Sequence, residues 1–437
     1  MCFIRFELKI TLNWSLRFSM TKLFLFVCFL TLVLPGCQPP LNEDQYLLIN
    51  LMKREPLQFR YFIDHKDSLE IQIIYTQINR DANNRPTFRS FYFNVDSTRY
   101  FYPASTVKLP MILLSLEKLK QLHIRGLDKS TAMYHDSVYE GQRCVTEDAT
   151  SQSCSPSLGH YIKKILVVSD NDAYNRLYEF LGQQATNENL WRKGYTLHIL
   201  HRLDRPLTPD QNRHTEPVRF LNDDSLIYCQ PMLVGDSIPV STFVLKGKGY
   251  FRNDTLIEKP FDFSYKNFFP LTEQQRLLRT LLFPRSVRQE ARFDITDEDR
   301  KFVLQYMSQL PTETFFPPYA KDSTYYPAFG KYLMFGGNKG PIPKHIRIFN
   351  KVGEAYGYLI DNAYIVDFEN GVEFMLSAVI ATNVDQIYND DKYEYKTLGY
   401  PFMKNLGQLV YQYELERKRI RRPDLSEFKL QYDSVPQ

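Results

Sequence analysis

The chain has 437 residues, 43% of them hydrophobic and 15% aromatic, which is enough for one large folded domain or two moderate ones. Its 54 basic and 50 acidic residues leave a net charge of only +4, which argues against a nucleic-acid-binding protein. The aromatic residues are spread along the chain, which argues against a disordered one. A short basic run at 417–423 is interpreted as a solvated helix end.

The first predicted element is an apolar leader. From Met20 the chain reads MTKLFLFVCFLTLVLPGC, and its apolar stretch is too short to span a bilayer comfortably. The LPGC segment at its end resembles a bacterial lipobox, whose cysteine becomes the lipidated first residue of the mature protein. We therefore predict a signal segment over 1–37, translation from Met20, and lipid on Cys37 that anchors the protein to the bacterial envelope membrane, facing the periplasm or the cell exterior. A plain secretory signal that contains a cysteine by chance is the alternative.

A helix and two strands are predicted next. Residues 43–63 have a broad apolar face at helical spacing, interrupted by Pro56. Residues 69–78 and 87–95 are rich in β-branched and aromatic side chains, and the turn between them carries paired asparagines suited to positive φ. From Ser105 the pattern is helical to about residue 182, and helical or irregular to about residue 225.

The remaining chain mixes both patterns. Residues 226–233 and 241–251 are possible strands, whereas 271–282 and 295–310 resemble helices that open with threonine and acidic residues. Three consecutive strands are predicted at 346–353, 357–368 and 372–382, with Asn370-Gly371 as a hairpin turn between the last two. A closing amphipathic helix follows at about 397–416.

These elements predict an α+β fold. Two strands cannot bury a face alone, so we expect the two N-terminal and three C-terminal strands to form one five-stranded antiparallel sheet flanked by the terminal helices. The middle of the chain, at about 100–225, then forms a helical lobe inserted into a domain that spans 38–437. A cleft between lobe and sheet is a natural place for a site.

Three short motifs follow one another along the chain. Ser105 and Lys108 form a Ser-x-x-Lys motif at the start of an apolar helix, 169–171 read Ser-Asp-Asn, and 351–353 read Lys-Val-Gly. Ser-x-x-Lys alone is weak evidence, because it occurs four times, beginning at Ser19, Ser105, Ser115 and Ser426. Ser-Asp-Asn and Lys-x-Gly each occur once. Each motif has a structural interpretation by itself, as a helix cap or an exposed lysine, but their order favours a common site.

The residue types fit nucleophilic catalysis. A serine hydroxyl is a poor nucleophile unless a neighbouring group accepts its proton, and Ser105 and Lys108 lie one helical turn apart. A lysine acts as that base only if burial and nearby positive charge lower its pKa, and Lys351 across the cleft is expected to supply such charge. Ser169 is expected to pass the proton to a leaving nitrogen. Backbone N–H groups of Ser105 and of the strand after Lys351 are expected to form an oxyanion hole.

In this order the motifs resemble those of penicillin-recognising serine hydrolases, and of the class A β-lactamase family in particular. The resemblance covers most of the mature chain except 226–345, which is therefore interpreted as an insertion. It implies a monomeric serine hydrolase that is acylated at Ser105 by β-lactams or related amides. The catalytic residues would be Ser105, Lys108, Ser169 and Lys351, and the substrate-binding residues Asn171, Val352 and Gly353.

The family pattern fails at one important place. Arg202-Leu203-Asp204-Arg205 resembles the entry to the family's omega loop, where a glutamate two residues after the second arginine activates the deacylating water. That position is Leu207 here, which cannot accept a proton. Asp204, Asp210 or Glu216 are possible substitutes, and spacing selects none of them. Val352 also replaces a threonine whose hydroxyl would bind a substrate carboxylate. An acyl-enzyme is therefore expected to form more readily than it hydrolyses.

Three functions remain open. The first is a β-lactamase-type hydrolase, the second a D-Ala-D-Ala peptidase that acts on peptidoglycan, and the third a binding lipoprotein that has lost turnover. Leu207 weakens the first, and the intact motif residues weaken the third.

The cysteines and histidines suggest structure rather than metal chemistry. Cys144 and Cys154 are close enough in sequence to close a small disulfide loop outside the cytoplasm. His198 and His201 form a His-x-x-His pair without further ligands nearby and are interpreted as surface or packing residues. We expect no metal and no other cofactor.

Overall fold

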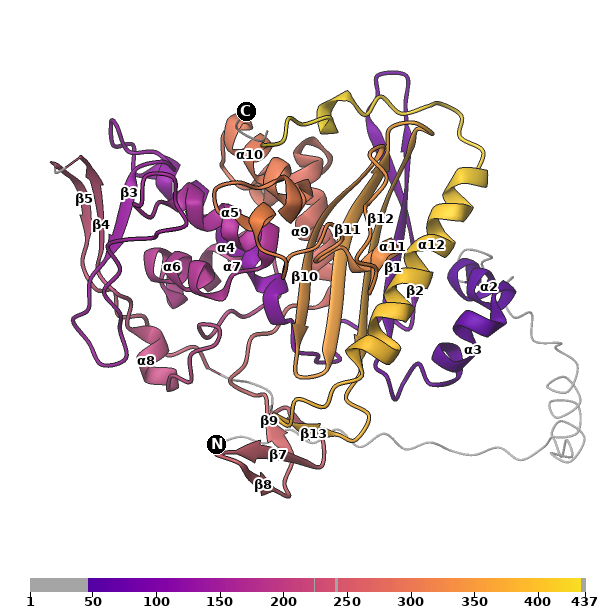
Figure 1. The fold of residues 1–437 in the computed structure, drawn as a ribbon, viewed down its shortest axis with the longest axis horizontal. Coiled ribbons are helices and arrows are strands. Elements are labelled where there is room, and N and C mark those ends of the chain that lie inside the picture. Colours follow the sequence, from indigo (N-terminus) through magenta and orange to yellow (C-terminus); the bar gives the residue numbers. More distant parts are fainter. Residues whose placement is uncertain (1–45, 224, 240–242, 434–437) are drawn as a thin grey trace, which may run out of the picture. The chain divides into compact units, whose positions relative to one another are not determined.

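A computed structural model describes residues 46–433, except 224 and 240–242 (Figure 1). The signal segment, Met20 and Cys37 lie outside the described residues. Within the described part of the chain, no helix is both long and apolar enough to cross a bilayer.

The centre of the fold is a five-stranded antiparallel sheet with the order β10-β11-β12-β1-β2 (Figure 1). Its strands are β1 (Gln72–Arg80), β2 (Pro86–Phe93), β10 (Ile346–Ala355), β11 (Tyr358–Asp367) and β12 (Val372–Ala381). β1 pairs with β12, so the N-terminal hairpin joins the C-terminal meander as predicted. The turn residues Asn84 and Gly371 both have positive φ, which asparagine and glycine tolerate.

Helices cover both faces of the sheet because side chains alternate along each strand (Figure 1). On β12, Phe374 and Leu376 pack with the terminal helices α2 (Leu47–Arg54), α3 (Pro56–Asp64) and α12 (Tyr400–Glu416), whereas Met375 packs into the core of the lobe. α12 is the predicted closing helix, and it buries Phe402, Leu406 and Val410.

The lobe packs around the buried helix α4 (Lys108–Gln121). Its other helices are α5 (Leu158–Val168), α6 (Asn171–Leu181), α7 (Gln183–Arg192) and α8 (Pro209–Arg213). It also contains a small sheet of β3 (Ala132–His135), β4 (Val218–Asn222) and β5 (Ser225–Gln230), of which only the β5 region was predicted as a strand. The lobe therefore contains more strand than the sequence indicated.

Residues 226–345 are distributed over several parts of the fold. β5 belongs to the lobe, and α9 (Leu271–Leu282) packs on the central sheet, where the Gln275 side chain contacts Thr76 and Ser377. α10 (Asp297–Ser308) packs on α5 and on β10, and the short α11 (Tyr332–Phe335) follows. The candidate strand at 241–251 divides between two small sheets, whose strands are β6 (Leu245–Lys246), β7 (Gly249–Arg252), β8 (Thr255–Ile257), β9 (Phe261–Asp262) and β13 (Ile387–Tyr388).

Single-turn helices complete the fold. They are Ala104–Val107, Pro284–Ser286, Gln289–Ala291, Pro311–Glu313, Tyr319–Lys321 and Ser426–Phe428, together with a π-turn at Tyr395–Gly399 that leads into α12.

Candidate active site

Ser105 lies in the 3-10 turn Ala104–Val107, which leads directly into α4. The turn is closed by Thr106, whose backbone N–H and hydroxyl both donate to Pro103 O, at 3.1 and 2.7 Å. Ser105 makes no capping hydrogen bond to α4, so its hydroxyl does not serve as a helix cap. Its Oγ instead lies 2.8 Å from Lys108 Nζ.

Lys108 is fully buried and is held by atoms that can only accept hydrogen bonds. Its Nζ donates to Ser169 O at 2.5 Å and to Asn171 Oδ1. The orientation of Asn171 is determined by its other contact, because its Nδ2 donates to the Asp204 carboxylate. Two N–H bonds of Lys108 are thus used by carbonyl oxygens. The remaining position faces Ser105 and, in the neutral amine, is a lone pair that can accept the serine proton.

Burial is the main cause of a lowered pKa at Lys108, to about 7, and the carboxylates of Asp170 and Asp204 oppose it. The prediction that the positive charge of Lys351 lowers the pKa of Lys108 is wrong, because burial alone lowers it. Burial, followed by repulsion from Lys108, lowers the pKa of Lys351 well below its usual value. The lowered pKa values of both lysines therefore favour a free amine beside Ser105 or Ser169.

The Ser-Asp-Asn segment connects α5 to α6. Its aspartate stabilises the start of α6, and its serine belongs to the candidate site. Asp170 caps α6, since its Oδ1 accepts from Ala173 N at 2.7 Å. Ser169 ends α5 with a φ of 64°, in the left-handed region. Its Oγ lies 3.3 Å from Lys108 Nζ and 2.7 Å from Lys351 Nζ. The segment thus supplies the link between the two lysines.

Lys351 and Gly353 lie on β10, the edge strand next to the serine turn. A Cβ at Gly353 would lie 2.7 Å from Pro103 O and 3.2 Å from Ala104 Cβ, so only glycine allows this strand to approach the turn so closely. Val352 is buried on the same strand. The structure therefore joins five of the seven predicted catalytic and substrate-binding residues by direct contacts, namely Ser105, Lys108, Ser169, Asn171 and Lys351, and it places Gly353 against the serine turn with Val352 beside it on β10.

A cavity of about 500 Å³ opens in front of Ser105. Its walls come from the serine turn, the omega-like loop, β10 and the segment after β13, and they include Tyr102, Asn171, His201, Asp204, Lys266, Glu354, Tyr356, Asp391 and Tyr393. A neighbouring cavity of about 400 Å³ shares His201, Arg205, Pro206 and Lys266 with it. The cleft therefore extends well beyond the nucleophile.

The three candidate carboxylates, Asp204, Asp210 and Glu216, lie in different surroundings. They belong to the omega-like loop, the segment that begins at Arg202. Asp210 is exposed and pairs with Arg213, and Glu216 is buried beneath Arg176. Asp204 alone of the three lines the cleft with Ser105, and it has a φ of 51°, a strained conformation for a residue with a side chain.

The loop is held in place by a buried ion pair. Arg202 donates to both Glu179 oxygens, at 2.5 and 2.6 Å, and stacks over the Tyr178 ring. Leu207 lines the neighbouring cavity and lies under Gly141. The carboxylate of this loop that lines the cleft is thus two residues after Arg202, at Asp204, rather than two residues after Arg205.

The predicted disulfide is wrong for this structure, because Cys144 and Cys154 are both free and exposed. The reason lies in the loop between them. Asp148 N donates to Cys154 O at 3.0 Å, and Cys154 N donates to Ser151 O at 3.1 Å. These turns place Cys154 beside Asp148 instead of beside Cys144. Cys229 is also a free exposed thiol.

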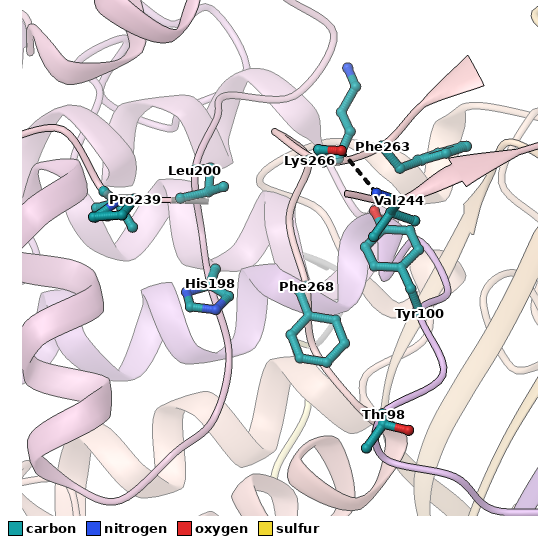
Figure 2. Close-up of a pocket in the computed structure, with 11 residues that line it drawn as sticks. Thr98, Tyr100, His198, Leu200, Pro239, Val244, Phe263, Lys266 and Phe268 are labelled. Carbon is teal, nitrogen blue, oxygen red and sulfur yellow. Dashed lines mark hydrogen bonds between the residues drawn. The ribbon is translucent and has the colours of Figure 1, made fainter. Parts of the chain in front are cut away.

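The two histidines occupy different places. His201 stacks on Tyr102, which lines the main cleft, and its Nδ1 lies 2.6 Å from Arg202 O, which makes Nδ1 the donor. His198 lines a separate cavity of about 140 Å³, where it and Leu200 face Phe268 and Tyr100 (Figure 2). None of Ser105, Lys108, Ser169 and Lys351 lines this smaller cavity. Within the described chain, no group of three or more His, Cys, Asp or Glu side chains is arranged to hold a metal.

Residues 64–222 match the model of the β-lactamase enzyme family. The matched segment contains Ser105, Lys108, Ser169, Asn171 and Asp204, but not β10 with Lys351. It confirms the resemblance to β-lactamase-like serine hydrolases that the motifs predicted. No curated protein matches the chain.

Several solved structures are similar to the chain. The β-lactamase from Sphaerobacter thermophilus DSM 20745 is 12% identical, with a TM-score of 0.46, over 84% of this chain and 96% of that one. A mutant of PBP-A, in an acyl-enzyme complex with penicillin G, is 14% identical with a TM-score of 0.45, over 85% and 98%. A β-lactamase from Xanthomonas campestris pv. campestris str. ATCC 33913 is 14% identical with a TM-score of 0.44, over 84% and 98%.

Proposed function

We propose that this chain, which resembles the β-lactamase enzyme family over residues 64–222, is a serine hydrolase that β-lactams or related amides acylate at Ser105. One observation carries the proposal. Ser105 Oγ, Lys108 Nζ, Ser169 Oγ and Lys351 Nζ form a continuous chain of contacts at 2.8, 3.3 and 2.7 Å. Such a chain can remove a proton from the nucleophile and deliver a proton to a leaving group.

Acylation follows from this geometry. The neutral Lys108 amine takes the Ser105 proton while Ser105 Oγ bonds to the substrate carbonyl carbon, and the carbonyl oxygen becomes an oxyanion at the mouth of the serine turn. The carbon–nitrogen bond then breaks. The proton passes from Lys108 through the Ser169 hydroxyl to the leaving nitrogen, and Lys351 on the far side of Ser169 orients that hydroxyl. The products are an ester at Ser105 and a free amine.

Deacylation needs a base that activates water, and we assign this role to Asp204. Its carboxylate lines the cleft beside Ser105, and its contact with Asn171 aligns it with the Lys108 network. An aspartate side chain is one methylene shorter than a glutamate, so hydrolysis is expected to be slow relative to acylation. The acyl-enzyme should therefore accumulate.

A peptidoglycan peptidase is the second candidate. The shared boundary between the main cleft and its neighbour, at His201, Arg205, Pro206 and Lys266, gives room for a substrate longer than a bicyclic lactam. The apolar Val352, in place of a hydroxyl, also removes a contact for a small substrate's carboxylate. The complete proton-transfer chain argues against the third function, a lipoprotein that only binds its ligand. For either substrate, lipid on Cys37 would hold the enzyme at the envelope membrane.

Intact-mass spectrometry during incubation with penicillin G, and in parallel with a fluorophosphonate, tests the proposal. We expect one covalent adduct per chain with each reagent, and the penicillin adduct should decay slowly. A short-lived penicillin adduct favours a β-lactamase, and a lasting one favours a peptidase. Absence of an adduct with both reagents contradicts the proposal.

A further inference from the structure

Lys331 is a buried lysine that none of the sequence motifs includes. Its side chain is 4% exposed, and its Nζ donates to Met307 O at 2.8 Å, to Ile348 O at 3.0 Å and to Asn350 Oδ1 at 2.7 Å. Its three N–H bonds therefore all have neutral acceptors. Among the residues that the structure describes, no carboxylate forms an ion pair with it. A buried ammonium without a direct counter-ion is costly, and burial lowers the pKa of Lys331 to about 7, so its position calls for a reason.

The segment that carries Lys331 contacts one side of β10. Besides the Lys331 contacts, Gly330 O accepts from Asn350 Nδ2 at 2.8 Å, and Tyr332 OH donates to Glu354 Oε2 at 3.0 Å. Asn350 alternates along the strand with Lys351, so its side chain lies on the opposite side from that of Lys351, whereas Glu354 at the end of the strand lines the cleft. Residues 330–333 thus form a clamp that holds β10 both behind Lys351, at Asn350, and at the edge of the cleft, at Glu354.

The clamp extends into the sheet through Asp361. Asn350 Nδ2 also donates to Asp361 Oδ1 at 2.8 Å, and Leu333 N donates to Asp361 Oδ2 at 2.9 Å. β10 is an edge strand, and its outer carbonyl groups have no neighbouring strand to pair with. Lys331 Nζ donates a hydrogen bond to one of these carbonyl groups, that of Ile348. The clamp therefore restrains the free edge of β10 two residues before Asn350 and three before Lys351.

We propose that Lys331 is a positioning residue of the active site, which anchors the edge of β10 so that Lys351 reaches Ser169. The inference rests on the proposed function. The charged groups that face Lys331 are Asp361 from β11, Arg347 and Lys351 from β10, and Glu313 from the turn Pro311–Glu313. Burial and then repulsion from Lys108 lower the pKa of Lys351 most, Asp361 raises it, and the positive charge of Lys331 lowers it further.

The variant Lys331→Met tests the proposal, because methionine has similar length but neither charge nor donors. We expect fluorophosphonate labelling of Ser105 to become at least about tenfold slower. We also expect the midpoint of its pH profile to move upward by about half a unit or more, since losing a neighbouring positive charge lets the Lys108–Lys351 pair hold its proton to higher pH. Lys344→Met, at an exposed lysine just before β10, is the matched control and should change neither quantity.

The pH midpoint distinguishes positioning from general destabilisation, which lowers the amount of active protein at every pH. Lys331→Arg keeps the charge, and we expect it to keep the wild-type midpoint even if its rate falls. If Lys331→Met does not fold, Lys331→Gln replaces it, and the same comparison applies. A folded uncharged variant with the wild-type rate and midpoint overturns the inference, as does failure of both uncharged variants to fold while Lys331→Arg shifts the midpoint. If the wild-type protein itself is not labelled, the proposed function fails instead.

Discussion

Lys108 Nζ lies 2.8 Å from Ser105 Oγ, although the two residues belong to different elements, a 3-10 turn and the α-helix that follows it. In a 3-10 turn, side chains three residues apart are nearly eclipsed, which brings this pair into contact. Ser115 and Lys118 have the same spacing inside the regular helix α4. Lys118 there donates to Phe180 O and Gln230 Oε1, and Ser115 Oγ has no partner in the described chain.

This difference leads to the first prediction. Ser105→Ala should abolish covalent labelling by penicillin and by a fluorophosphonate, because the other hydroxyl in the Lys108 network, that of Ser169, does not line the cleft. Ser115→Ala should label at the wild-type rate and serves as the control. Labelling is measured by intact mass, and cooperative thermal unfolding checks that both variants fold. A folded Ser105→Ala protein that still labels at the wild-type rate would show that the nucleophile lies elsewhere.

The second prediction concerns the proton acceptor. The pKa of Lys108 is lowered to about 7 by burial, and only the neutral amine can accept the Ser105 proton. The acylation rate should therefore rise with pH, by about tenfold per unit below pH 7, and level off above it. Lys108→Met should lower the plateau by at least about 10²-fold, the usual scale for loss of a general base. Stopped-flow acylation with a chromogenic cephalosporin measures both, and a flat pH profile would contradict the assignment.

The third prediction concerns Asp204. Asp204→Asn should leave acylation within about tenfold of the wild-type rate but lengthen the life of the acyl-enzyme by about 10²-fold or more, because the amide cannot accept a proton from water. Asp210→Asn, on the exposed part of the same loop, should leave the lifetime unchanged. The decay of the penicillin adduct is followed by mass. Equal lifetimes for Asp204→Asn and wild-type protein would exclude Asp204 as the base.

The fourth prediction concerns the approach of β10 to the serine turn. In Gly353→Ala the new methyl group would meet Pro103 O, so the strand or the turn must move. A displacement of about 1 Å at a catalytic centre costs about 10²-fold in rate, and we expect a loss of this size in acylation with little change in unfolding temperature. Wild-type acylation by a folded Gly353→Ala protein would mean that the close approach is not needed.

The fifth prediction concerns the leader. Cys37 should be the first residue of the mature protein and should carry lipid when the protein is expressed with its leader in a bacterium. Mass spectrometry of the membrane-extracted protein identifies the N-terminal residue and its modification. Cys37→Ala should release the protein from the membrane fraction. An unmodified N-terminus at another residue would refute the assignment.

The central sheet and the closing helix were predictable because their signals are local. The strands β10, β11 and β12 are ten residues each, long enough for their composition to stand out, and the Asn370-Gly371 turn joins the last two. The small strands β6 to β9 have two to four residues each, and so short a pattern cannot be distinguished from a loop. The candidate strand at 241–251 was divided for this reason.

The cysteine pair and the carboxylate of the omega-like loop could not be assigned from local sequence. Cys144 and Cys154 have suitable spacing, yet hydrogen-bonded turns within the loop direct the two cysteines apart. Likewise, Leu207 occupies the position that motif spacing selects, whereas the left-handed conformation at Asp204 turns a different carboxylate toward Asn171. Backbone conformation at single residues decided both cases, and it leaves no periodic pattern in a sequence.

Three motifs in a fixed order are enough to name the residues of the candidate site, Ser105, Lys108, Ser169, Asn171 and Lys351. Alternation and helical spacing predict the strands and helices that carry them, because both patterns reflect burial of a face. How these residues meet follows from the packing of the fold alone. Ser169 in the left-handed region, Gly353 against Pro103 O, and Lys331 behind Asn350 all depend on segments far apart in the chain. Such contacts arise from packing of the whole fold, so local sequence cannot specify them.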